Sequence, residues 1–135
     1  MTAEFFVRAT PSDDGNFAEC SYYADKQATT PIPGSTFNVR KNAGECIFTE
    51  ADGSSLTLIG ASFSTLGGTP GMNSSNFCPA DADHSIRVNM PTTFICTKGV
   101  VLLFSSPDVV DNIYPSSDPQ IINDGPLPPP PAVAG

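Results

Sequence analysis

Apolar and polar residues alternate in short runs along most of the chain, and turn-forming residues separate the runs. The first two runs cover residues 4–9 and 17–23. No stretch of a dozen residues repeats apolar positions at helical spacing without an intervening Pro or Gly. Alternation with a period of two places side chains on opposite faces of a strand. The pattern therefore predicts an all-β protein.

The middle of the chain contains three further runs, at residues 36–40, 45–49 and 55–59. They are separated by Asn42-Ala43-Gly44 and by Ala51-Asp52-Gly53. Short Asn-, Asp- and Gly-containing links are typical of hairpin turns. We expect three antiparallel strands in a meander, with one face of the sheet toward a core and the other toward water.

The later runs cover residues 84–89, 92–97 and 100–104. The last of these is apolar on both faces, which is typical of a central strand in a sandwich or of one packed on a neighbouring subunit. Before them, residues 64–83 form a long irregular stretch rich in Gly, Asn and Ser. Long loops on a rigid scaffold often carry recognition, so this stretch is the first candidate contact surface among the loops.

Beyond Pro107 the chain becomes punctuated by Pro and Asp, so we place a domain boundary near Ser106. Residues 1–106 are expected to form an antiparallel β-sandwich, of jelly-roll or immunoglobulin-like type, and residues 107–135 an extended Pro-rich C-terminal arm. The four prolines at residues 128–131 favour polyproline II structure. Such a stretch could be a ligand for an SH3- or WW-type groove, but no Arg or Lys flanks it, so a structural arm is favoured. The residues expected to contact another chain are Ile113, Tyr114, Ile121, Ile122, Leu127, Pro128, Pro129, Pro130 and Pro131.

The composition fits one domain and excludes several partners. The chain has 135 residues and a net charge of −8, from 14 acidic and 6 basic residues. This balance argues against binding to nucleic acid or to anionic membranes, which need Lys and Arg. The excess carboxylates are expected to maintain solubility, with Ca²⁺ or a basic protein surface as alternative roles. The longest apolar run is too short for a membrane helix of about 20 residues. No basic region precedes a long apolar stretch at the N-terminus, so we expect a chain made in the cytosol or a mature domain with an added Met.

Four cysteines, Cys20, Cys46, Cys78 and Cys96, are too widely spaced for the paired cysteines of zinc and redox motifs. Each lies in or beside an apolar stretch, which favours buried free thiols. One or two disulfides are the alternative.

Candidate chemistry is sparse. His84 is the single histidine of the sequence, and no nucleophile motif accompanies it. Asp81, Asp83 and His84 could converge on a cation, although a solvated turn before a strand is the favoured interpretation. Phosphate-binding Gly motifs do not occur in the sequence. The sequence therefore predicts no catalytic residue, metal or cofactor.

In size, acidity and Ser/Thr/Gly/Pro content, the chain resembles the decoration or cement proteins of viral capsids. The resemblance covers the whole chain and depends on no motif. It implies a non-enzymatic structural protein of the virion, binding protein subunits of a larger assembly through loops and terminal arms, and forming a homo-oligomer. The alternative is a secreted or surface-displayed β-sandwich that binds carbohydrate or protein.

Overall fold

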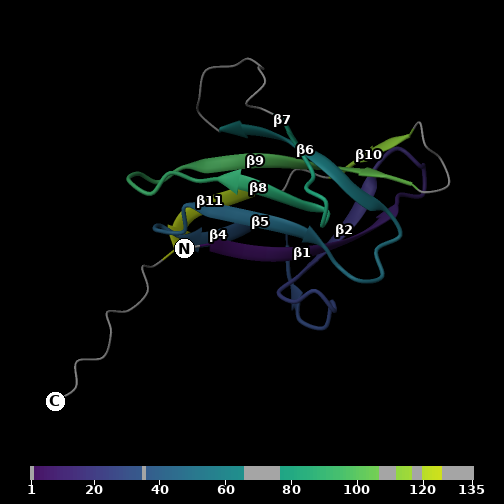
Figure 1. Cartoon of the computed structure of the whole chain (residues 1–135), viewed down its shortest axis with the longest axis horizontal. Coiled ribbons are helices and arrows are strands. Elements are labelled where there is room, and N and C mark those ends of the chain that lie inside the picture. Colours follow the sequence, from purple (N-terminus) through teal and green to yellow (C-terminus); the bar gives the residue numbers. More distant parts are fainter. Residues whose placement is uncertain (1, 35, 66–76, 107–111, 117–119, 126–135) are drawn as a thin grey trace.

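The computed structural model describes residues 2–34, 36–65, 77–106, 112–116 and 120–125. The strands are β1 (Thr2–Pro11), β2 (Ala18–Tyr23), β3 (Pro31–Ile32), β4 (Thr36–Arg40), β5 (Glu45–Glu50), β6 (Thr57–Thr65), β7 (Phe77–Pro79), β8 (Ser85–Asn89), β9 (Thr97–Ser105), β10 (Ile113–Pro115) and β11 (Gln120–Gly125). They form two sheets packed face to face, as Figure 1 shows. The predicted all-β sandwich is confirmed. No helix in the described ranges is long and apolar enough to cross a membrane.

Sheet A has the strand order β3-β2-β1-β5-β8, and sheet B has the order β4-β11-β9-β6-β7 with β10 also paired to β9. Most neighbouring strands are antiparallel. However, β1 pairs in parallel with β5, and β11 pairs in parallel with β4. Both sheets are therefore mixed, because each contains one parallel pair among antiparallel ones.

The predicted meander is wrong, although its strands form close to the expected positions. Strands β4 and β6 belong to sheet B, whereas β5 lies between them in sequence but belongs to sheet A. The short links at 41–44 and 51–56 therefore cross from one sheet to the other. Alternation shows which face of a strand is buried, but it does not show to which sheet the strand belongs. Both sheets of a sandwich turn their buried faces toward the same core.

Aromatic rings from both sheets meet in the core. Phe37 of β4 lies at the centre of this cluster. Three rings of sheet A surround it, those of Phe5, Tyr22 and Phe48, with centroid distances of 4.7, 4.9 and 5.4 Å. The pairs with Tyr22 and Phe48 are edge-to-face and the pair with Phe5 is tilted. Aromatic pairs add about 0.5–1.5 kcal/mol each beyond the area they bury. The cluster therefore fixes how the two sheets face each other.

The predicted boundary at Ser106 needs correction, because two strands after it complete sheet B. Strand β10 pairs with the end of β9, and β11 lies between β4 and β9. Tyr114 and Ile121 are buried in the core of their own sandwich. The sandwich therefore extends to Gly125, and residues 113–115 and 120–125 are not an arm. The N-terminal residues from Thr2 onward are likewise a strand of sheet A rather than an arm.

The flanking residues explain why the sequence did not predict β11. Gln120, Asn123, Asp124 and Gly125 are poor strand formers, so Ile121 and Ile122 resembled isolated anchors. Partners far away in the sequence make this segment a strand. Residues 126–135, which include Leu127 and Pro128 to Pro131, lie outside the described residues.

Candidate functional site

Exposed apolar side chains are the most informative surface feature of the described residues. Two of them, Phe94 and Ile95, are adjacent in the sequence and are 59% and 62% exposed. They lie in the loop of residues 90–96 between β8 and β9. The sequence predicted a strand at residues 92–97, but residues 92–96 form no strand. The exposed large apolar side chains of the described residues are those of Phe17, Ile59, Phe77, Phe94, Ile95 and Ile113.

Asn123 of β11 holds this loop in place. Its side chain is fully buried and its amide Nδ2 donates to the carbonyl oxygens of Pro91 at 2.7 Å and Phe94 at 2.9 Å. Its Oδ1 accepts from the backbone N–H of Cys96. A buried polar side chain whose groups are all paired gives a rigid local structure. The loop therefore presents Phe94 and Ile95 in a fixed conformation.

The base of the loop carries positive charge. The Lys98 ammonium donates to the carbonyl of Asn89 at 2.6 Å, and the N–H of Met90 donates to the carbonyl of Gly44 at 2.8 Å. The second bond joins the loop to the turn that follows Arg40, whose side chain is exposed. Lys41 follows Arg40 directly. These bonds bring Arg40, Lys41 and Lys98 to the same end of the fold as the loop.

Strand registers place this loop at one end of the sandwich. Thr2 lies opposite Glu45, and Glu45 lies opposite Asn89, the last residue before the loop. Ile122 lies opposite Thr97, so β11 also ends there. We call this the loop end, and the opposite end, where β1 stops and β10 begins, the turn end. Figure 1 shows the N-terminus and the β11 label on one side and β10 on the other.

The turn end carries a second ordered segment, the turn at residues 12–17. The Ser12 hydroxyl donates to Asp14 Oδ1 at 2.6 Å, and the N–H of Asn16 donates to the same oxygen at 3.1 Å. The hydrogen bond from Ser12 has the largest effect in lowering the pKa of Asp14, and the bond from the Asn16 N–H lowers it further. The carboxylate of Asp14 therefore stays ionised. The N–H of Phe17 donates to the Ser12 hydroxyl at 3.1 Å. The turn therefore holds Phe17, which is 53% exposed, beside two carboxylates, those of Asp13 and Asp14.

An open hollow of about 520 Å³ lies against this turn. An isolated parallel bridge between Ala18 and Ser116 joins the two sheets at this point. The lining residues are Ser12, Phe17, Ala18, Glu19, Cys20 and Ser116. The volume falls in the range of roughly 300–1,000 Å³ that is typical of ligand pockets. We call it the Phe17 hollow.

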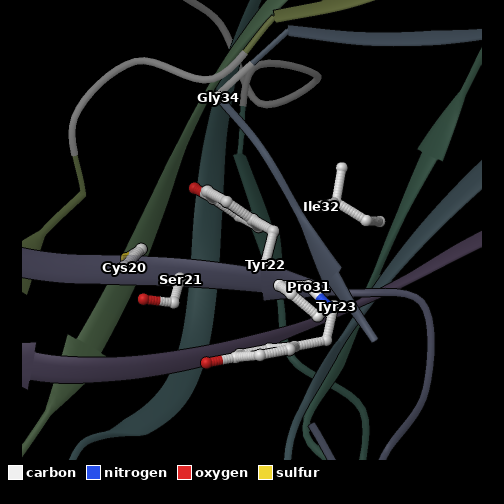
Figure 2. A pocket seen from close by; sticks show the side chains of 7 residues that line it. All are labelled: Cys20, Ser21, Tyr22, Tyr23, Pro31, Ile32 and Gly34. Carbon is white, nitrogen blue, oxygen red and sulfur yellow. The ribbon is translucent and has the colours of Figure 1, made fainter. Parts of the chain in front are cut away.

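A smaller hollow of about 270 Å³ lies further along β2, next to β3. Its lining residues are Cys20, Ser21, Tyr22, Tyr23, Pro31, Ile32 and Gly34. Figure 2 shows the rings of Tyr22 and Tyr23 extending from opposite sides of β2. Among the residues that the structure describes, no group forms a hydrogen bond with the buried Tyr22 hydroxyl. Burial raises the pKa of Cys20 to about 12, and burial and the adjacent Cys20 raise the pKa of Tyr22, so both groups stay neutral near pH 7.

Of the residues predicted from the sequence to contact another chain, some are exposed, some are buried in the core and some lie outside the described residues. Ile113, at the start of β10, is 59% exposed at the turn end, and Ile122 is half-buried. Tyr114 and Ile121 fill the core of their own sandwich, so they present no apolar surface to another subunit. Leu127 and Pro128 to Pro131 lie outside the described residues. So do residues 66–76 of the predicted contact loop, whereas residues 77–79 form β7.

The acidic turn at residues 81–84 is engaged within the fold. The Asp81 carboxylate pairs with Arg87 at 3.2 Å, and the N–H of His84 donates to the backbone carbonyl of Asp81. Within the described ranges, no group of three or more His, Cys, Asp or Glu residues could hold a metal ion. The four cysteines are free, and Cys46 and Cys96 are buried, in agreement with the favoured interpretation.

No family model matches this sequence, and no curated protein matches it either. Function is therefore inferred from the surface of the fold itself. Phe94, Ile95 and Asn123 were not among the residues predicted from the sequence. The signal available in the sequence was Pro91 at the start of the run, which disfavours a regular strand at that position.

Proposed function

We propose that this chain is a non-enzymatic structural protein that binds an assembled protein surface through the 90–96 loop. One observation carries this proposal: Phe94 and Ile95 are exposed on a loop that a buried Asn123 holds rigid. Exposed apolar residues are common singly on protein surfaces, whereas contiguous exposed apolar surface marks contact sites, and Phe94 and Ile95 are adjacent and ordered.

The rigidity of the loop favours binding. An interface gains most from a few large apolar or aromatic residues that are buried at its centre. Ordering a flexible segment during association reduces that gain, whereas a loop already fixed by Asn123 avoids most of the cost. Arg40, Lys41 and Lys98 lie at the same end of the fold as the pair. The partner surface that fits best is therefore an apolar hollow bordered by carboxylates.

A virion component remains the proposed kind of assembly, with the chain decorating or cementing protein subunits of a capsid. A small, acidic β-sandwich that presents one apolar loop is compatible with such a role. The buried thiols support a non-enzymatic role, because raised pKa values keep Cys20 and Cys46 in the weakly nucleophilic thiol form.

Photo-crosslinking tests this proposal. A photoreactive residue replaces Ile95 in the full-length protein, and Ile59, an exposed isoleucine on β6, is replaced in a matched control. We expect position 95 to cross-link to a defined protein in the cells or particles that contain the chain. Equal cross-linking from positions 95 and 59 would overturn the proposal.

A further inference from the structure

We propose that copies of this chain associate head to tail, with the 90–96 loop of one copy docked in the Phe17 hollow of the next. This inference rests on the proposed function and names a second copy as the protein that the loop binds. It follows from two unlike surfaces that lie at opposite ends of the same molecule.

The loop end supplies a projecting apolar pair with positive charge around it. Phe94 and Ile95 project from the loop, and the basic residues of its base are Arg40, Lys41 and Lys98. The Glu45 carboxylate at this end pairs with Arg87 at 3.0 Å, and Arg87 also pairs with Asp81 at 3.2 Å. The loop end therefore has an apolar tip and a cationic border.

The turn end supplies the complementary features. Phe17 and Ala18 line the hollow, and Ile113 is exposed at the same end. Negative charge borders it: Glu19 lines the hollow, and Asp13 and Asp14 are exposed on the adjoining turn. Asp52 and Asp83 are exposed at this end of the sandwich as well. Two basic residues lie beside Asp52: the Arg8 guanidinium donates to the Asp52 carbonyl at 2.9 Å, and the Lys26 carbonyl accepts from the Asp52 N–H. Carboxylates still outnumber basic residues at this end. An acidic border around an apolar hollow matches a cationic border around an apolar knob.

Both surfaces are ordered before they meet. Asn123 fixes the loop, and the hydrogen bonds of Ser12 and Asp14 fix the turn that carries Phe17. The contact joins different patches on the two copies, so it is heterologous. Such a contact repeats from copy to copy, giving a ring if the rotation closes and an open filament if it does not.

Sedimentation velocity of the purified full-length protein over a range of concentrations tests this inference. We expect the wild-type protein to form dimers and longer species as the concentration rises. The loop-end variant F94S/I95S and the turn-end variant F17S should each weaken association at least about tenfold, since central apolar contacts dominate interfaces. The charge reversal D13K should also weaken association, because it places a positive charge opposite the basic residues of the loop end. Circular dichroism checks that every variant is folded.

Phe77→Ser is the matched control. Phe77 is 53% exposed, as is Phe17, but it lies at the start of β7 and borders neither surface. It should therefore associate like the wild-type protein. Equal weakening by F77S and F17S would mean that general surface hydrophobicity drives association, and would overturn the inference.

Mixing the two classes of variant gives a sharper result. F94S/I95S keeps an intact hollow and F17S keeps an intact loop, so a mixture should form 1:1 dimers and nothing longer. A contact between two identical loops would leave F17S fully associated, and that result would overturn the inference. A wild-type protein that stays monomeric would also overturn it, whereas cross-links from position 95 to a different protein would still support the proposed function.

Discussion

Single residues decide whether the loop end keeps its shape, and Asn123 is the most consequential of them. Its amide pairs with the backbone of Pro91, Phe94 and Cys96. Asn123→Ala leaves these buried groups unpaired, and we expect a loss of about 3 kcal/mol in the free energy of unfolding. Denaturant unfolding measures this, and amide exchange at Cys96 should accelerate. Asn112→Ala, at an exposed site, is the control, and equal effects of the two substitutions would contradict this role.

Cys46 is expected to give the protein a stability limit at alkaline pH. Burial raises the pKa of its thiol from 9.0 to about 12. The folded state therefore favours the neutral thiol, so this contribution is complete below about pH 9 and is lost as the pH rises toward 12. In that interval we expect the free energy of unfolding to decrease by up to about 1.4 kcal/mol per pH unit because of this thiol. Cys46→Ala should reduce the decrease in the free energy of unfolding that denaturant curves show between about pH 9 and pH 11, and an unchanged slope would contradict the assignment.

Sequence patterning predicted the buried residues better than the exposed ones. Phe37 and Val39 face the core, as the alternation in the run at residues 36–40 indicated. Phe17 and Phe94 were also assigned to strands, yet both are exposed at strand ends or in a loop. Alternation does not show where the pairing between strands ends. For Phe94 the loop conformation depends on a hydrogen bond from Asn123, which lies 29 residues away in the sequence.

Among the elements, β11 has the strongest effect on the sheet because it lies between β4 and β9. A chain that ends at Gly125 retains both described sheets, so we expect its melting temperature to match that of the full chain. A chain that ends at Ser106, the boundary expected from the sequence, loses the buried Tyr114, Ile121 and Asn123. We expect this shorter chain not to fold cooperatively in thermal melts. A sharp melting transition for it would show that β11 is dispensable.

The sequence predicted strands more reliably than their neighbours. The positions of β4, β5 and β8 match the expected runs closely, because each has a clear alternation between turn residues. The pairing of β1 with β5 and of β4 with β11 had no local signal. These parallel pairs join segments that are distant in sequence, and only packing of the whole sandwich selects them.

For the whole molecule, the separation of charge between the two ends makes the proposed association sensitive to salt. Raising the NaCl concentration shortens the screening length from about 10 Å at 0.1 M to about 3 Å at 1 M. We expect association to weaken several-fold while the melting temperature changes little, since the core is apolar. Sedimentation velocity and thermal melts at matched salt concentrations test this. Association that strengthens with salt would show that the charges at the two ends repel each other.

The central position of β11 also has a consequence for biosynthesis. A ribosome makes β4 and β9 before β11, so the facing edges of these two strands stay unpaired until residues 120–125 have emerged. Unpaired edges of apolar strands can add strands from other chains. A nascent chain therefore completes sheet B only after β11 has emerged, and until then the edges of β4 and β9 are open to pairing with neighbouring chains.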